Sequence, residues 1–262
     1  MTLTASLVIL AIGIALTLAL IGLVRRFVPV ELRGHEERRG WVFAFCGVLY
    51  ALVVGFVLAF ALNGHQSASS QTNVEADSVT ALSRTATLFD AESRDRIGHE
   101  LICYARSVIE DEWPAMAEGR SSVLASAASD RLFQSFGRLG RSNPNQAALE
   151  TSLDRVRDLG EARAGRLLMS HQSLPPMFWV FMIGGGLILI AYATVLAGRE
   201  RLGGQIMFIL PVTLLLLCSI YLVAAFEKPF REPNAIAPRA MQVALESVTS
   251  FVPDPRADRP CP

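Results

Sequence analysis

Four long apolar runs alternate with polar segments along the chain and decide its predicted architecture. Each run is about 20 residues long, enough to cross a bilayer core of roughly 30 Å as a helix. The runs lie at residues 3–24, 41–62, 177–197 and 206–226, and none contains Asp, Glu, Lys, Arg or His. The pattern therefore predicts an all-α, polytopic membrane protein with four transmembrane helices.

The segment between the second and third runs is polar, yet its apolar residues recur at helical spacing. Such amphipathic stripes are typical of helices that pack on one face. We therefore expect a helical extramembrane module between the second and third membrane helices. The predicted domains are a transmembrane hairpin at residues 1–63, the helical module at 64–176, a second transmembrane hairpin at 177–226 and a polar tail at 227–262.

Local signals predict where the helices of this module begin and end. Asp90 is a candidate N-cap for a helix that Pro114 should end, because proline does not fit a helix interior. Further helices are expected near residues 127–139 and 146–169. The small and polar residues 64–73 indicate either a frayed helix end or a flexible neck.

The second apolar run carries a stripe of small residues and, about 100° around the helix, a stripe of bulky ones. The small stripe is Gly47, Ala51, Gly55 and Ala59, and the bulky stripe is Leu52, Phe56 and Phe60. Small residues at this spacing let membrane helices approach closely, so the first stripe is a candidate packing surface. The bulky stripe has three interpretations: it faces lipid, packs against a neighbour, or lines a dewetting constriction in a pore.

Composition supports a membrane protein and narrows its function. The chain of 262 residues is 52% hydrophobic and only 18% charged, whereas soluble domains average about 25% charged. The net charge is zero, so nothing indicates a nucleic-acid partner. Pumps and coupled transporters usually need ionisable residues inside the membrane. Their absence from the four runs favours passive conduction or a structural role.

No motif indicates an enzyme, a metal site or a cofactor. The sequence lacks a P-loop, a dinucleotide fingerprint, HExxH and a nucleophile elbow. Its histidines are isolated: His35, His65, His99 and His171. The run of Glu110, Asp111 and Glu112 provides oxygen ligands for a hard cation, but consecutive helical residues point in different directions. A solvated helix end is the preferred interpretation of this run.

The four cysteines fall into two pairs of different character. Cys46 and Cys218 lie inside apolar runs, where cysteine acts as a small hydrophobic residue. Cys103 and Cys261 lie in polar regions, and they can pair only if both face an oxidising compartment.

Three stretches carry a resemblance to a known family. They are ELRGHEERRGWVFAFCGVLYALVVGFVLAF at residues 31–60, ICYARSVIEDEWPAM at 102–116 and EKPFREP at 227–233. Together with the four-span layout, they resemble the bacterial bestrophin-like domain family over most of the chain. Residues 56–60 (FVLAF) also look like the FVLGF stretch of true bestrophins, which are pentameric chloride channels. That resemblance implies an apolar neck at Leu52, Phe56 and Phe60, although Ala59 replaces the glycine.

Two functional hypotheses follow. The first is a homo-oligomeric anion channel of the cell inner membrane, pentameric if it follows bestrophins, whose partners are the lipid bilayer, further copies of itself and small anions. The second is a non-conducting membrane sensor or scaffold whose helical module binds a partner. The absence of intramembrane charge agrees with both.

The orientation of the chain in the membrane has two predictions. Residues 25–39 hold five arginines and residues 199–201 hold two, and the positive-inside rule puts such short basic loops in the cytoplasm. The helical module and both termini would then lie outside. The resemblance to bestrophin channels implies the reverse, with the module and termini in the cytosol.

Overall fold

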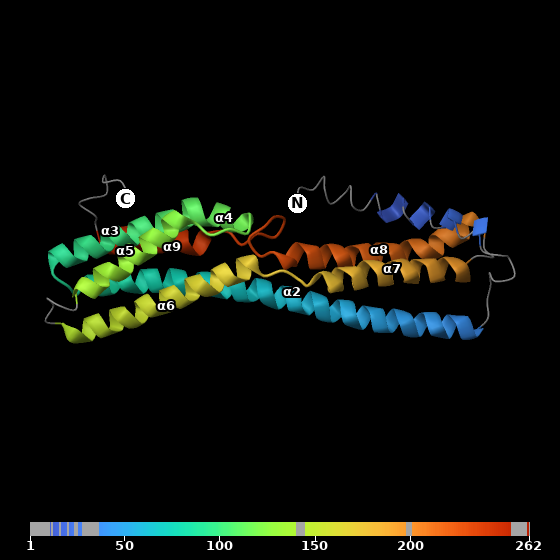
Figure 1. Ribbon diagram of the computed structural model, residues 1–262, viewed down its shortest axis with the longest axis horizontal. Coiled ribbons are helices and arrows are strands. Elements are labelled where there is room, and N and C mark those ends of the chain that lie inside the picture. The colour runs from blue at the N-terminus through green and yellow to red at the C-terminus, as the bar shows by residue number, and fades with distance from the viewer. Residues whose placement is uncertain are drawn as a thin grey trace. The chain divides into compact units, whose positions relative to one another are not determined.

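The computed structural model describes residues 37–139, 145–197, 201–252 and 261, and residues 11–27 except 12, 16, 20, 24, 25 (Figure 1). Every regular element in these residues is helical. The chain divides into two compact units. The first, called the apolar unit, consists of Met1–Asn63 and Ser173–Glu227. The second, called the polar unit, consists of Gly64–Gln172 and Lys228–Pro262.

The apolar unit contains the helices that can cross a membrane. They are the N-terminal part of α2 (Glu37–Ala86), α7 (Pro176–Leu196) and α8 (Leu202–Glu227). Among the described residues, three helices are candidate membrane spans by length and composition: Gly40–Ala86, Pro176–Leu196 and Gly203–Glu227. Gly13–Leu23 is a shorter apolar helix. Residues 3–10 of the first predicted span lie outside the described residues, so the fourth span stays a prediction.

Close packing between α2 and α7 defines the core of the apolar unit. The Tyr50 hydroxyl donates to the carbonyl oxygen of Met182 over 2.7 Å. A Cβ atom added at Gly185 would lie 2.9 Å from the Tyr50 ring, so this glycine makes room for the tyrosine. Farther along the same pair of helices, Phe43 stacks on Tyr192 with ring centroids 5.9 Å apart.

A carboxylate joins the end of α8 to the start of α7. Glu227, the last residue of α8, accepts a hydrogen bond from the Leu174 backbone N–H at 2.9 Å. The Trp179 indole N–H donates to the same oxygen at 3.5 Å. This contact fixes the approach of the chain to α7, whose first residue is Pro176, a residue suited to the first turn because it needs no N–H partner.

The polar unit is a bundle of helices around one core. Its elements are the C-terminal part of α2, α3 (Ala91–Ser107), the π-helical turn η2 (Val108–Glu112), α4 (Trp113–Ala117), α5 (Val123–Leu139), α6 (Gln146–His171) and α9 (Arg239–Phe251). Helix α3 packs against both α5 and α9 (Figure 1). Leu82, Ile97 and Leu132, from three of these helices, are fully buried in the core.

Most of the predicted helix boundaries are confirmed, and the exceptions have physical reasons. Asp90 caps α3 by accepting a hydrogen bond from the Ser93 backbone N–H at 3.0 Å. Pro114 does not end a helix: it occupies the first turn of α4, where a proline costs no hydrogen bond. Helix α5 begins at Val123, four residues earlier than expected.

The prediction of a frayed end or flexible neck at residues 64–73 is wrong. Helix α2 continues without interruption from Glu37 to Ala86. Ala68 and Thr72 are buried in the polar unit, and the Thr72 hydroxyl donates to the Ala68 carbonyl at 2.9 Å. Tertiary packing therefore outweighs the weak helix preference of this polar stretch.

Candidate pore helix and buried charge cluster

Helix α2 presents a distinct buried face to the apolar unit. Tyr50, Val54, Val57 and Ala61 are each at most 7% exposed. They recur at three- and four-residue spacing, so they form one continuous stripe along the helix. This stripe fixes the rotation of α2 and thereby determines which residues face away from the unit.

The bulky stripe faces away from the rest of the apolar unit. Leu52, Phe56 and Phe60 are 56%, 68% and 55% exposed. Leu52 lies two positions from both Tyr50 and Val54, or about 200° around the helix, so it points almost directly away from the buried stripe. Phe56 and Phe60 lie farther around the helix, on the same exposed side. These side chains are therefore available to lipid, to another copy of the chain or to a pore.

The small stripe does not pack against another helix of the same unit. Ala51, Gly55 and Ala59 are exposed, and Gly47 is half-buried. A Cβ atom added at Gly47 or Gly55 would meet no other atom within 4 Å. Its role in helix packing therefore stays a prediction, and any partner must come from outside the described part of the chain.

A second candidate site is a buried charge cluster in the polar unit, defined by Glu75, Glu112, Arg163 and Arg166. Glu75 comes from α2, Glu112 from η2, and both arginines from α6. The side chains of Glu75, Glu112 and Arg166 are 0% exposed. Two carboxylates and two guanidinium groups balance in formal charge, which a buried ionic group requires.

Arg166 is the centre of the charge cluster. Its Nε and Nη2 donate to the two oxygens of Glu75 at 2.6 and 2.9 Å. Nη2 also donates to Glu112 at 2.7 Å. The other Glu112 oxygen accepts from Arg163 at 2.6 Å. Arg166 therefore joins the extension of α2 to η2 through charge-assisted hydrogen bonds, the strongest kind in proteins.

Aromatic residues complete the surroundings of the charge cluster. The Tyr104 hydroxyl donates to Glu75 Oε1 at 2.6 Å. The Arg166 guanidinium carbon lies 5.1 Å from the ring centroid of Trp113, a cation–π distance. The Trp113 indole N–H donates to the Ile236 carbonyl at 2.8 Å. The segment before α9 is thus tied to the same group of side chains.

The environment keeps these groups in defined protonation states. Burial raises the pKa of the Tyr104 hydroxyl well above its usual value, and the Glu75 carboxylate raises it further. Burial by itself lowers the pKa of the Arg166 guanidinium, but Glu75, Tyr104 and Glu112 together raise it by more, so the net direction is upward. Tyr104 therefore stays a hydrogen-bond donor and Arg166 stays charged.

The interpretation of Glu110, Asp111 and Glu112 as a solvated helix end is wrong for its last member. Glu112 is fully buried, whereas Glu110 is exposed. Glu112 ends the π-helical turn η2, whose backbone hydrogen bonds span one residue more than those of an α-helix and so change the directions of its side chains. Glu112 is neutralised by arginines, and no group of acidic, histidine or cysteine residues in the described part of the chain is arranged to hold a metal ion.

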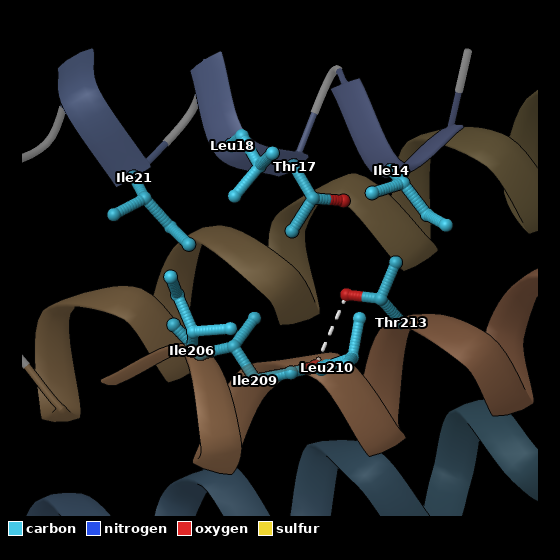
Figure 2. A pocket seen from close by; sticks show the side chains of 8 residues that line it. All are labelled: Ile14, Thr17, Leu18, Ile21, Ile206, Ile209, Leu210 and Thr213. Atoms are coloured by element: carbon cyan, nitrogen blue, oxygen red, sulfur yellow. Dashed lines mark hydrogen bonds between the residues drawn. The ribbon is translucent and has the colours of Figure 1, made fainter. Parts of the chain in front are cut away.

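A small apolar cavity lies between the short apolar helix Gly13–Leu23 and α8 (Figure 2). Its volume is about 20 Å³, close to the room that one water molecule needs. The hydroxyls of Thr17 and Thr213 both donate within their own helices, to Gly13 at 2.9 Å and Ile209 at 3.1 Å. The cavity is therefore a packing gap between helices, too small and too apolar for a substrate.

Residues 11–241 match the family described as the Bestrophin-like domain. The chain belongs to the bestrophin-like family. The resemblance inferred from the sequence motifs is thus confirmed, and the chain is an all-helical membrane protein with the bestrophin fold. No curated protein matches it.

Solved structures support the bestrophin fold. A variant of a bacterial bestrophin homologue from Klebsiella pneumoniae aligns with a TM-score of 0.74 and 12% identity, covering 94% of this chain and 98% of that chain. A crystal structure of a homologue from the same organism, solved by zinc phasing, gives a TM-score of 0.72, 12% identity and the same coverage. At such low identity this similarity establishes the fold alone.

Within this bestrophin-like chain, sequence reasoning singled out the bulky stripe of α2, with three interpretations left open, but missed the charge cluster. Glu75 and Arg166 each had a local signal, because each is a single charge on an otherwise small or apolar stripe. Glu75 follows Ala68 and Thr72, and Arg166 follows Leu159 and Ala162. A lone charge on a core-facing stripe indicates a buried ion with a partner elsewhere.

Proposed function

We propose that this bestrophin-like protein is a homo-oligomeric channel of the inner membrane that conducts small anions. The observation that supports this function best is the outward face of α2, where Leu52, Phe56 and Phe60 stay exposed in the single chain. In an oligomer with α2 next to the axis, the three side chains form successive apolar rings. Such rings make a narrow, dry constriction that controls the passage of ions.

The rest of the apolar unit fits this role. Helices α7 and α8 expose large apolar side chains such as Val180, Ile188 and Leu215, which suits contact with lipid. Residues 3–24 form a fourth transmembrane helix in this proposal, and the polar unit lies outside the bilayer. The FVLAF stretch of α2 resembles the FVLGF stretch of true bestrophins, which are chloride channels, and this resemblance gives the proposal its ion class.

The test is chloride flux through purified full-length protein in liposomes, with particle symmetry determined by electron microscopy. We expect chloride efflux above that of protein-free liposomes, and a closed ring with α2 on the axis. A monomer or dimer without an axial hole, together with no flux, would exclude the channel and leave the non-conducting sensor or scaffold.

The small stripe on α2 predicts where the subunits meet. Replacing Gly47 or Gly55 with leucine should weaken the oligomer in detergent, because the added carbons overfill a close helix contact, at a cost of about 1–3 kcal/mol. The fold of the single chain should persist, because a Cβ atom at either position meets nothing within 4 Å. Size-exclusion chromatography with light scattering measures the assembly.

Gly185→Leu is the matched control for these two variants. Its side chain would collide with Tyr50, 2.9 Å from the added Cβ atom, so it should lower the melting temperature of the single chain. If Gly47→Leu and Gly55→Leu both leave assembly unchanged, the small stripe faces lipid and does not form the contact.

A further inference from the structure

We propose that Cys103 and Cys261 are joined by a disulfide bond in the cell, and that the polar unit and the C-terminus therefore lie in the oxidising periplasm. This proposal concerns the location of the polar unit, and it does not depend on whether the protein conducts ions.

The fold brings the two cysteines together from distant parts of the chain. Cys103 lies in α3 and is 1% exposed. It is disulfide-bonded to Cys261, 158 residues later, with Cα atoms 5.4 Å apart. This separation is within the range in which a disulfide forms without backbone movement.

Packing next to the disulfide already holds the tail against α3. Helix α9 contacts α3 and buries Met241 and Val248 in the common core. At its end, Val252 is fully buried and packs so closely on α3 that a Cβ atom added at Gly98 would collide with it. The tail is therefore anchored to α3 by apolar contacts up to nine residues before Cys261, and the disulfide adds a covalent bond to the same pairing.

The chemistry of the bond determines the compartment. Cytosolic reductants keep thiols reduced, whereas the bacterial periplasm is oxidising. We infer that the bond forms by thiol–disulfide exchange with an oxidised dithiol protein of the periplasm. The thiols of Cys103 and Cys261 together lose two protons and two electrons, and the disulfide of the oxidant gains both and becomes a dithiol.

The charge of the short loops points independently to the same orientation. Residues 25–39 and 199–201 together hold seven arginines, which the positive-inside rule puts in the cytoplasm. Along the chain, the two candidate spans α7 and α8 separate the two segments of the polar unit, Gly64–Gln172 and Lys228–Pro262. Two crossings return the chain to the same side of the membrane, as a bond between Cys103 and Cys261 requires.

The other two cysteines provide an internal reference. Cys46 and Cys218 are free thiols on exposed faces of α2 and α8, inside the candidate spans. Their thiols inside the membrane say nothing about the compartment that the polar unit faces. A count of cysteines that become reactive only after reduction therefore reports the bonded pair alone. The orientation is the opposite of the one that the resemblance to bestrophin channels implies.

The experiment counts oxidised cysteines in intact cells that express the full chain. Cells are quenched with acid, dissolved in SDS with excess N-ethylmaleimide, reduced, and labelled with polyethylene glycol maleimide. We expect two added labels per chain after reduction and none without it. The Cys103→Ser variant should take up no label, and a Cys46→Ser, Cys218→Ser double variant should still take up two.

A reporter at the C-terminus tests the orientation in the wild-type chain, so the conclusion does not depend on the folding of a variant. Alkaline phosphatase, which is active only outside the cytoplasm, should be active when fused to the C-terminus. Green fluorescent protein fused at the same position should not fluoresce. No label after reduction, a disulfide that links two chains, or a fluorescent fusion would each overturn the proposal.

Discussion

Replacing Phe56 with alanine should raise chloride flux through the reconstituted protein several-fold. Phe56 lies outside the buried stripe of α2 and is 68% exposed in the single chain. If it forms an apolar ring around the axis, loss of the phenyl group widens the constriction and admits water, so an ion loses less of its hydration. Phe60→Ala should act in the same direction, and the double variant more strongly. The measurement is chloride efflux from liposomes, with a thermal melt of the same samples.

Phe208→Ala is the matched control, because Phe208 is an exposed phenylalanine on α8, 60% exposed, and not on the outward face of α2. It should leave the flux unchanged. The packing interpretation predicts a different result for Phe56→Ala: removal of a phenyl group buried in a well-packed protein core costs about 3–5 kcal/mol. A destabilised Phe56→Ala variant with no flux would remove the pore assignment, and with it most of the support for a channel.

The apolar unit was largely predictable because its signals are local. Uninterrupted apolar runs predict membrane helices by length and composition alone. The repeat of Leu52, Phe56 and Phe60 follows from the geometry of a single helix. Which stripe of α2 is buried depends on Tyr50 contacting α7, a contact across 132 residues, and no local pattern predicts such a contact.

The polar unit shows where sequence reasoning fails. Glu75 and Arg166 are 91 residues apart, and only the fold reveals that they pair. Pro114 carries a signal that fits both the end of one helix and the first turn of the next. Residues 64–73 look weakly helical, but buried contacts of Ala68 and Thr72 keep α2 intact. In each case tertiary contacts decide between local alternatives that the sequence leaves nearly equal.

The largest loss of stability should come from Arg166→Met. Methionine fills a similar length but leaves Glu75 and Glu112 as buried carboxylates without their central partner. Removal of one member of a buried ion pair typically costs about 3–5 kcal/mol. The loss should appear as a lower melting temperature of the polar unit, followed by circular dichroism in detergent and by the fluorescence of Trp113, whose ring packs on Arg166.

Two further variants distinguish the effect of unpaired buried charge from the effect of losing any arginine of α6. Arg155→Met removes an exposed i,i+3 pair with Asp158 on the same helix, and such surface pairs contribute at most about 1 kcal/mol. The double variant Glu75→Gln, Arg166→Met removes one carboxylate together with the guanidinium and leaves Glu112 paired with Arg163, so it should recover a large part of the lost stability. If Arg166→Met costs no more than Arg155→Met, the charge cluster does not hold the α2 extension in the polar unit. If the double variant is as unstable as Arg166→Met, the loss comes from packing rather than from a buried carboxylate without a partner.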